Sequence, residues 1–142
     1  MLIKLIGAAM LFACGGYYSK TAREKAEKEL SEVEFALSLI VRIKSEIADY
    51  GVPLGEILKS AGVNGGSEGV LRELTCEKVK ECLCDLNLIG RGYGKEELRI
   101  CDKIAEGLGA LKKETEARVR EVTAISRVKG YGVAAAAVIL LL

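Results

Sequence analysis

Two stretches without any charged side chain flank a densely charged middle in the hydrophobic and polar pattern of this chain. Residues 5–18 read LIGAAMLFACGGYY, and residues 130–142 read GYGVAAAAVILLL. As helices they would span about 21 Å and about 20 Å, against about 30 Å for the hydrocarbon core of a bilayer. Neither stretch shows the polar stripe that a helix at the edge of a soluble core keeps. We therefore expect two short transmembrane helices, over 1–18 and 130–142, with Lys4 extending outward to lengthen the first.

Small residues at four-residue spacing occur in both stretches and would let the two helices pack closely in lipid. The pairs are Ala9 with Ala13 and Gly132 with Ala136. Leu5 and Gly7 belong to the first predicted span, and Tyr17, Tyr18 and Tyr131 lie where interfacial aromatic residues are expected.

The middle of the chain, residues 19–129, shows helical periodicity. Between 19 and 49 there is neither Gly nor Pro, and the expected helix continues from the first span without a break. Its apolar positions follow alternating steps of three and four, which is typical of a helix packed against other helices. The predicted seam comprises Leu30, Val33, Leu37, Ile40, Lys44 and Ile47, with a second stripe at Phe35, Leu39 and Ile43.

Gly51 and Pro53 predict the end of this helix, with Pro53 in the first turn of a short helix over residues 54–61. A loop is expected over 62–69, and one or two helices over 70–88, with Thr75 as an N-cap. A long helix is expected from Lys95 to about Lys129, where Gly107 and Gly109 would allow a close neighbour or a bend. The predicted fold is all-α, a helical bundle flanked by an N-terminal and a C-terminal transmembrane helix. The predicted buried stripe of the long helix from Lys95 comprises Leu98, Cys101, Ile104, Leu108 and Leu111.

The charges indicate a topology. The 142 residues include 21 basic and 20 acidic side chains, and this near balance argues against a nucleic-acid partner. Ten Lys and Arg residues lie within about 20 residues of the two spans on the side of the middle domain, and only Lys4 lies on the other side. By the positive-inside rule, the middle domain is expected in the cytoplasm.

The sequence gives little support for a catalytic or metal-binding site. The chain has no His, which excludes Ser-His-Asp and Cys-His nucleophiles. The glycine-rich stretches 62–69 and 90–95 lack the Lys-Ser or Lys-Thr of a phosphate loop. Four cysteines would suffice for zinc, but their spacing lacks the paired C-x2-C pattern, so use as small buried residues is favoured over a metal site or a redox pair. They are Cys76, Cys82, Cys84 and Cys101. We expect no enzyme, no cofactor and no metal.

An alternative for the N-terminus is a lipoprotein signal. The segment 11–15, with sequence LFACG, places Cys14 after a short apolar stretch and would permit cleavage and lipidation there. Phe12 is bulky for that position, and such processing would place the middle domain outside, against the charge asymmetry.

With these features the chain resembles the stage III sporulation protein AB family of endospore-forming bacteria. The resemblance depends on the N-terminal MLIKLIGA, on the motif Glu46-Ile47-x-x-Tyr50-x-x-Pro53-Leu54, on Leu108-Gly109 and on the apolar C-terminal stretch. It covers about residues 1–60 and 95–142. The chain departs from the family in an abbreviated segment 62–94 and in lacking an Asp and a Gln after Leu108-Gly109.

The resemblance implies a two-span membrane protein with a cytoplasmic helical domain, similar to the platform proteins of type II secretion and type IV pilus machines. Such a protein would sit in the mother-cell membrane around the forespore. It would couple a secretion-type ATPase to other subunits of a channel, and it could form a homo-oligomer. An unrelated membrane-anchored helical interaction protein is the alternative.

Overall fold

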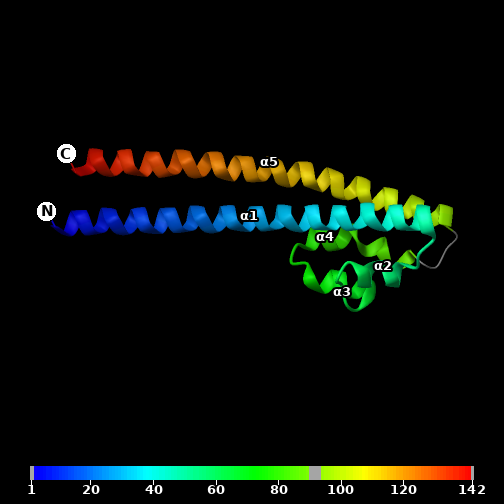
Figure 1. Cartoon of the computed structure of the whole chain (residues 1–142). Helices are drawn as coiled ribbons and strands as arrows, with labels where there is room; N and C mark the ends of the chain where they lie inside the picture. Colours follow the sequence, from blue (N-terminus) through cyan, green and yellow to red (C-terminus); the bar gives the residue numbers. More distant parts are fainter. Residues whose placement is uncertain (1, 90–93, 142) are drawn as a thin grey trace. The chain divides into compact units, whose positions relative to one another are not determined.

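The computed structural model describes residues 2–89 and 94–141, and every element in these residues is helical (Figure 1). The fold is therefore all-α, as predicted. The elements are α1 (Leu2–Tyr50), α2 (Leu54–Ser60), α3 (Gly66–Glu73), α4 (Glu77–Cys82), the 3-10 helix η1 (Cys84–Leu88) and α5 (Gly94–Leu141). The two uncharged stretches belong to longer helices, α1 and α5, and the first continues into the middle of the chain without a break, as expected.

The chain divides into two compact units. The terminal unit comprises residues 1–28 and 115–142, and the central unit comprises residues 29–114. This division follows the packing of the chain against itself. The predicted boundaries at 18/19 and 129/130 concern lipid and water, so they stay predictions.

The central unit has a continuous apolar core. The short helices α2, α3 and α4 lie together on one side of the C-terminal half of α1 (Figure 1). Fully buried side chains come from all of these elements and from α5, among them Ile40, Ile57, Val70, Val79 and Leu108. Burial of such side chains is the main favourable term in folding, at roughly 1.5–3 kcal/mol each.

The seam of α1 in this unit differs in part from the predicted one. Val33, Ile40, Ile43 and Ile47 are buried as expected. Phe35 was expected in the second stripe, but it is 40% exposed, and Ala36 is fully buried in its place. Ala36 lies three residues after Val33 and four residues before Ile40, so the predicted spacing was correct. The prediction failed because it chose the large side chain of Phe35 over the small one of Ala36 as the buried residue.

The turn after α1 follows the prediction. Gly51 adopts a positive φ of 60° and donates its backbone N–H to the carbonyl of Ile47 at 3.1 Å, as a glycine at a helix C-terminus does. Pro53 is the N-cap of α2 rather than part of its first turn, with φ −61° and ψ 139°. Its carbonyl accepts the backbone N–H of Glu56 at 2.9 Å.

The expected loop over 62–69 is wrong in its second half. Helix α3 begins at Gly66, and Gly69 is buried within it. A Cβ atom at Gly69 would overlap the carbonyl oxygen of Asn64 and would lie 3.0 Å from the carbonyl carbon. The residue there must be glycine because the loop chain passes directly over the helix.

In the terminal unit, the first part of α1 and the last part of α5 run antiparallel, so that their uncharged ends lie at the same end of the pair (Figure 1). The Ser19 hydroxyl donates a hydrogen bond to the Ser126 hydroxyl, and Ala26 is buried. Within the described residues, no helix includes a segment that is both long enough and apolar enough to cross a membrane.

Candidate functional site

The residues of the first family motif surround the end of α1. Glu46 is half-buried, and its carboxylate accepts a hydrogen bond from Arg42 Nε at 2.8 Å. Arg42 also donates to the Ser60 hydroxyl at 3.0 Å, which ties α1 to α2. Leu54 packs against the core. Tyr50 is the last residue of α1 and is 79% exposed.

The second motif has one structural residue and one unconstrained residue. Leu108 is fully buried in the central core. A Cβ atom at Gly109 would meet nothing within 4 Å, and one at Gly107 would meet only Cys82 Sγ, at 3.7 Å. Of the two glycines, Gly107 therefore has a neighbour, the side chain of Cys82, and the described residues place none at Gly109; α5 is continuous through both.

A set of hydrogen bonds that the sequence did not reveal joins α1 to the start of α4. The Glu32 carboxylate accepts the backbone N–H groups of Thr75 and Cys76, each at 2.8 Å, and also the Thr75 hydroxyl. The N-cap residue of α4 is Cys76, whose side chain makes no capping hydrogen bond. Thr75 was expected to be that cap. Nothing in the sequence neighbourhood of Glu32 reveals a partner 43 residues away.

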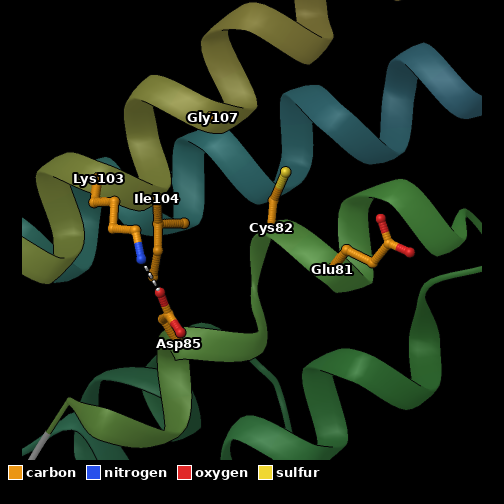
Figure 2. Close-up of a pocket in the computed structure, with 6 residues that line it drawn as sticks. All are labelled: Glu81, Cys82, Asp85, Lys103, Ile104 and Gly107. Atoms are coloured by element: carbon orange, nitrogen blue, oxygen red, sulfur yellow. Dashed lines mark hydrogen bonds and ion pairs between the residues drawn. The ribbon is translucent and has the colours of Figure 1, made fainter.

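A shallow pocket of about 220 Å³ lies in the central unit between α4, η1 and α5 (Figure 2). Its charged side chains include Asp85 and Lys103, which point toward one another and form an ion pair at 2.8 Å. Cys82 Sγ lies beside Gly107. Burial and the neighbouring Glu81 carboxylate raise the pKa of the Cys82 thiol, so the thiol stays protonated near neutral pH and is a poor nucleophile. This arrangement gives no argument for bond chemistry.

The cysteines are all free thiols. Cys101 is buried, Cys76 and Cys82 are half-buried, and Cys14 and Cys84 are exposed. Among residues 2–89 and 94–141, no three Cys, Asp or Glu side chains are grouped so that they could hold a metal ion. Only Cys101, and to a lesser degree Cys76 and Cys82, have the buried position expected for small apolar use; Cys84 does not.

The residues assigned to the membrane lie on an exposed surface. In the first uncharged stretch, every described side chain is exposed, including Gly7, Ala9, Ala13 and Cys14. Gly132 and Ala136 are also exposed. The side chain of Leu5 lies outside the described residues. The small residues are therefore not packed against a helix in the single chain, and close packing in lipid stays a prediction.

The large apolar and aromatic side chains that the structure describes in this stretch are exposed as well. Ile6 is 55% exposed, Met10 68%, Tyr17 75% and Tyr18 77%. The two helices are joined by the hydrogen bond between the hydroxyl groups of Ser19 and Ser126. The terminal unit thus exposes several large apolar side chains at its uncharged end, where a helix pair in water would bury such side chains.

The nearly neutral chain is divided electrically along the same boundary. The terminal unit holds nine basic and four acidic side chains, for a net charge of +5. The central unit holds 12 basic and 16 acidic side chains, for a net charge of −4. The overall charge of +1 conceals this separation.

Comparisons with family models, with curated proteins and with solved structures found no match to this chain. The resemblance to the sporulation family depends on the sequence motifs alone.

Proposed function

We propose that this chain is a membrane-anchored structural subunit, which holds partner proteins at a membrane through its central helical unit. The observation that supports the proposal most is the outward exposure of Ile6, Met10, Tyr17 and Tyr18 at the uncharged end of the terminal unit. Leaving such side chains in water forgoes roughly 1.5–3 kcal/mol for each one that could be buried. A lipid phase would cover them without a further protein.

The rest of the terminal unit agrees with an anchor in lipid. Helices in membranes associate through small residues and hydroxyl groups rather than through large apolar ones. The Ser19–Ser126 hydrogen bond and the buried Ala26 have this character. Each uncharged stretch is short for a bilayer, so the anchor relies on Lys4 extending to the surface and on local thinning of the lipid.

The sporulation resemblance makes the proposal more specific. The chain would belong to a secretion-like complex, in which it couples a cytoplasmic ATPase to membrane components. The central unit would then lie in the cytoplasm, and the terminal unit would anchor it in the mother-cell membrane around the forespore. The exposed Tyr50, in the most specific motif, is a candidate contact for such a partner. An unrelated interaction protein with the same anchor is the alternative function.

Labelling of the native cysteines tests the anchor. Cys14 and Cys84 are both exposed in the chain, so only lipid or a partner would hide one of them. In membrane vesicles with the cytoplasmic face outward, a membrane-impermeant maleimide should modify Cys84 and spare Cys14, as peptide mass spectrometry would record. Addition of detergent should make both react. Equal labelling without detergent would contradict the anchor.

Two further results bear on the alternatives. An intact mass that lacks residues 1–13 and includes a lipid on Cys14 would establish the lipoprotein reading instead. Gene neighbours that encode a secretion-type ATPase and several small membrane proteins would support the platform proposal. A source organism unable to form spores, with no such neighbours, would leave only the general anchor.

A further inference from the structure

Most of the positive charge of the terminal unit lies beside its uncharged end. Eight of its nine basic residues fall at positions 20–28 and 118–129, and we refer to these eight as the basic band. Ser19 and Ser126 are hydrogen-bonded to each other and so lie at one level, one residue after the first uncharged stretch on α1 and four residues before the second on α5. Lys25 and Arg120 are each six residues from that level, or about 9 Å along the helix axis.

Several cations of the band have no acidic partner. Lys25, Lys28, Arg120 and Lys129 are exposed, and within the described part of the chain none of them forms an ion pair. Two of the four acidic residues of the unit are already engaged, because Glu24 pairs with Lys20 at 3.8 Å and Glu27 pairs with Arg23 at 2.7 Å. The excess positive charge is therefore presented to the surroundings.

We infer that the basic band binds the headgroups of anionic phospholipids, so that the anchor selects a negatively charged membrane surface. This inference rests on the proposed anchor and adds the chemistry of its lipid partner. Charges act across roughly 8 Å at physiological ionic strength. The band begins at the edge of the two uncharged stretches and extends about 12 Å along α1 and about 17 Å along α5, so its members nearest that edge interact with the headgroups most strongly. Tyr17 and Tyr18 are exposed at this edge, at the level of the headgroups.

The charge of the central unit shows that the net charge of the whole chain does not decide its attraction to an anionic surface. With a net charge of −4, it is repelled by an anionic surface. Attraction to such a surface must therefore come from the terminal unit. Each Lys or Arg near an anionic membrane strengthens binding by about fivefold, and this gain is reduced by salt.

The full chain can be tested by cell-free synthesis in the presence of vesicles, followed by flotation. One set of vesicles contains phosphatidylcholine only, and the other contains phosphatidylcholine with phosphatidylglycerol. We expect preferential recovery with the second set, and we expect added salt to reduce the preference. The triple variant Lys25→Gln, Arg120→Gln, Lys129→Gln should lose the preference, with binding about a hundredfold weaker to the anionic vesicles.

A matched control removes the same number and kind of charges from the central unit. Lys59, Arg72 and Lys95 are exposed, and their replacement by Gln should leave the preference for anionic vesicles in place. Circular dichroism would establish that both variants remain helical. Equal loss in the two variants would reduce the effect to net charge and overturn the inference.

The remaining outcomes separate the inference from the proposed function. Equal recovery with both kinds of vesicle, at low and at high salt, would overturn the role of the basic band and leave the membrane anchor intact. Recovery with neither kind would overturn both. Binding to double-stranded DNA that is lost in the triple variant, while flotation is unchanged, would assign the band to another polyanion and overturn the inference.

Discussion

Glu32 on α1 and Thr75 before α4 are joined by two hydrogen bonds across 43 positions of sequence. The backbone N–H of Thr75 donates at 2.8 Å, and its hydroxyl donates to the same carboxylate. Glu32 thereby holds the two residues that precede the first turn of α4, where Cys76, the N-cap residue, makes no side-chain capping hydrogen bond. The six residues of α4 are too few to be stable alone, so the short helix depends on its contacts with the rest of the central unit.

The substitution Glu32→Ala should lower the free energy of unfolding by about 1–3 kcal/mol, since two backbone donors lose a charged acceptor. Glu32→Gln, which keeps one acceptor oxygen, should cost less. Urea unfolding would measure both. The control is Glu34→Gln, which removes an exposed ion pair with Lys112 at 3.0 Å and should change stability by less than about 1 kcal/mol. Equal losses at Glu32 and Glu34 would contradict the role of Glu32 in holding Thr75 and Cys76.

Two glycines should respond oppositely to replacement by alanine. Gly69→Ala forces a Cβ onto the carbonyl of Asn64, so the loop before α3 must move, at a cost of about 1–3 kcal/mol. Gly109→Ala meets no atom within 4 Å inside a helix, so it should stabilise by about 0.5–1 kcal/mol. Thermal unfolding of the two variants checks the difference in sign. A loss at Gly109 would indicate a neighbour that the single chain does not contain.

The register of the terminal helices can be fixed by a disulfide. In a chain with Cys14→Ser, the pair Ser19→Cys and Ser126→Cys should cross-link within one chain under mild oxidation, because their hydroxyl groups are hydrogen-bonded. The pair Tyr18→Cys and Ser126→Cys should cross-link poorly, since Tyr18 is exposed on the outer surface. Non-reducing electrophoresis with peptide mapping distinguishes the two. Efficient cross-linking of the second pair alone would show a different register.

Stability should fall at alkaline pH through Cys101. Burial, with the carboxylates of Asp102 and Glu97, raises the pKa of its thiol above the ordinary value of 9.0. Above pH 9 the unfolded chain releases this proton while the folded chain keeps it, so the free energy of unfolding decreases as pH rises toward the folded pKa. Cys101→Ala should weaken that decrease, as urea unfolding at several pH values would measure. Alkylation of Cys101 should also be slower than that of exposed Cys84.

The two family motifs predict different consequences of mutation. Leu108→Ala leaves a cavity in the core and should cost about 2–5 kcal/mol. Tyr50→Ala removes a side chain that is 79% exposed, so stability should change by less than about 0.5 kcal/mol. If Tyr50 contacts a partner, its variant should remain folded by circular dichroism and should fail to co-purify that partner. Unchanged co-purification would remove Tyr50 from the proposed interface.

The sequence by itself determined the helical class, the continuity of α1, the turn at Gly51 and much of the buried stripes of α1 and α5. These features follow from local rules: a period of three and four, a glycine with positive φ, and charges that avoid the core. The apolar period identified Val33, Ile40 and Ile43 correctly, and it failed at Phe35 because periodicity does not specify how large a residue fits.

Tertiary structure decided what depends on contacts between distant segments. The close passage of Asn64 over Gly69 and the hydrogen bonds from Thr75 to Glu32 follow from the fold, and no local pattern encodes them. The same is true of the charge separation. Residues 1–28 and 115–142 are far apart in sequence, and only their packing into one unit shows that a nearly neutral chain has a unit of +5 and a unit of −4.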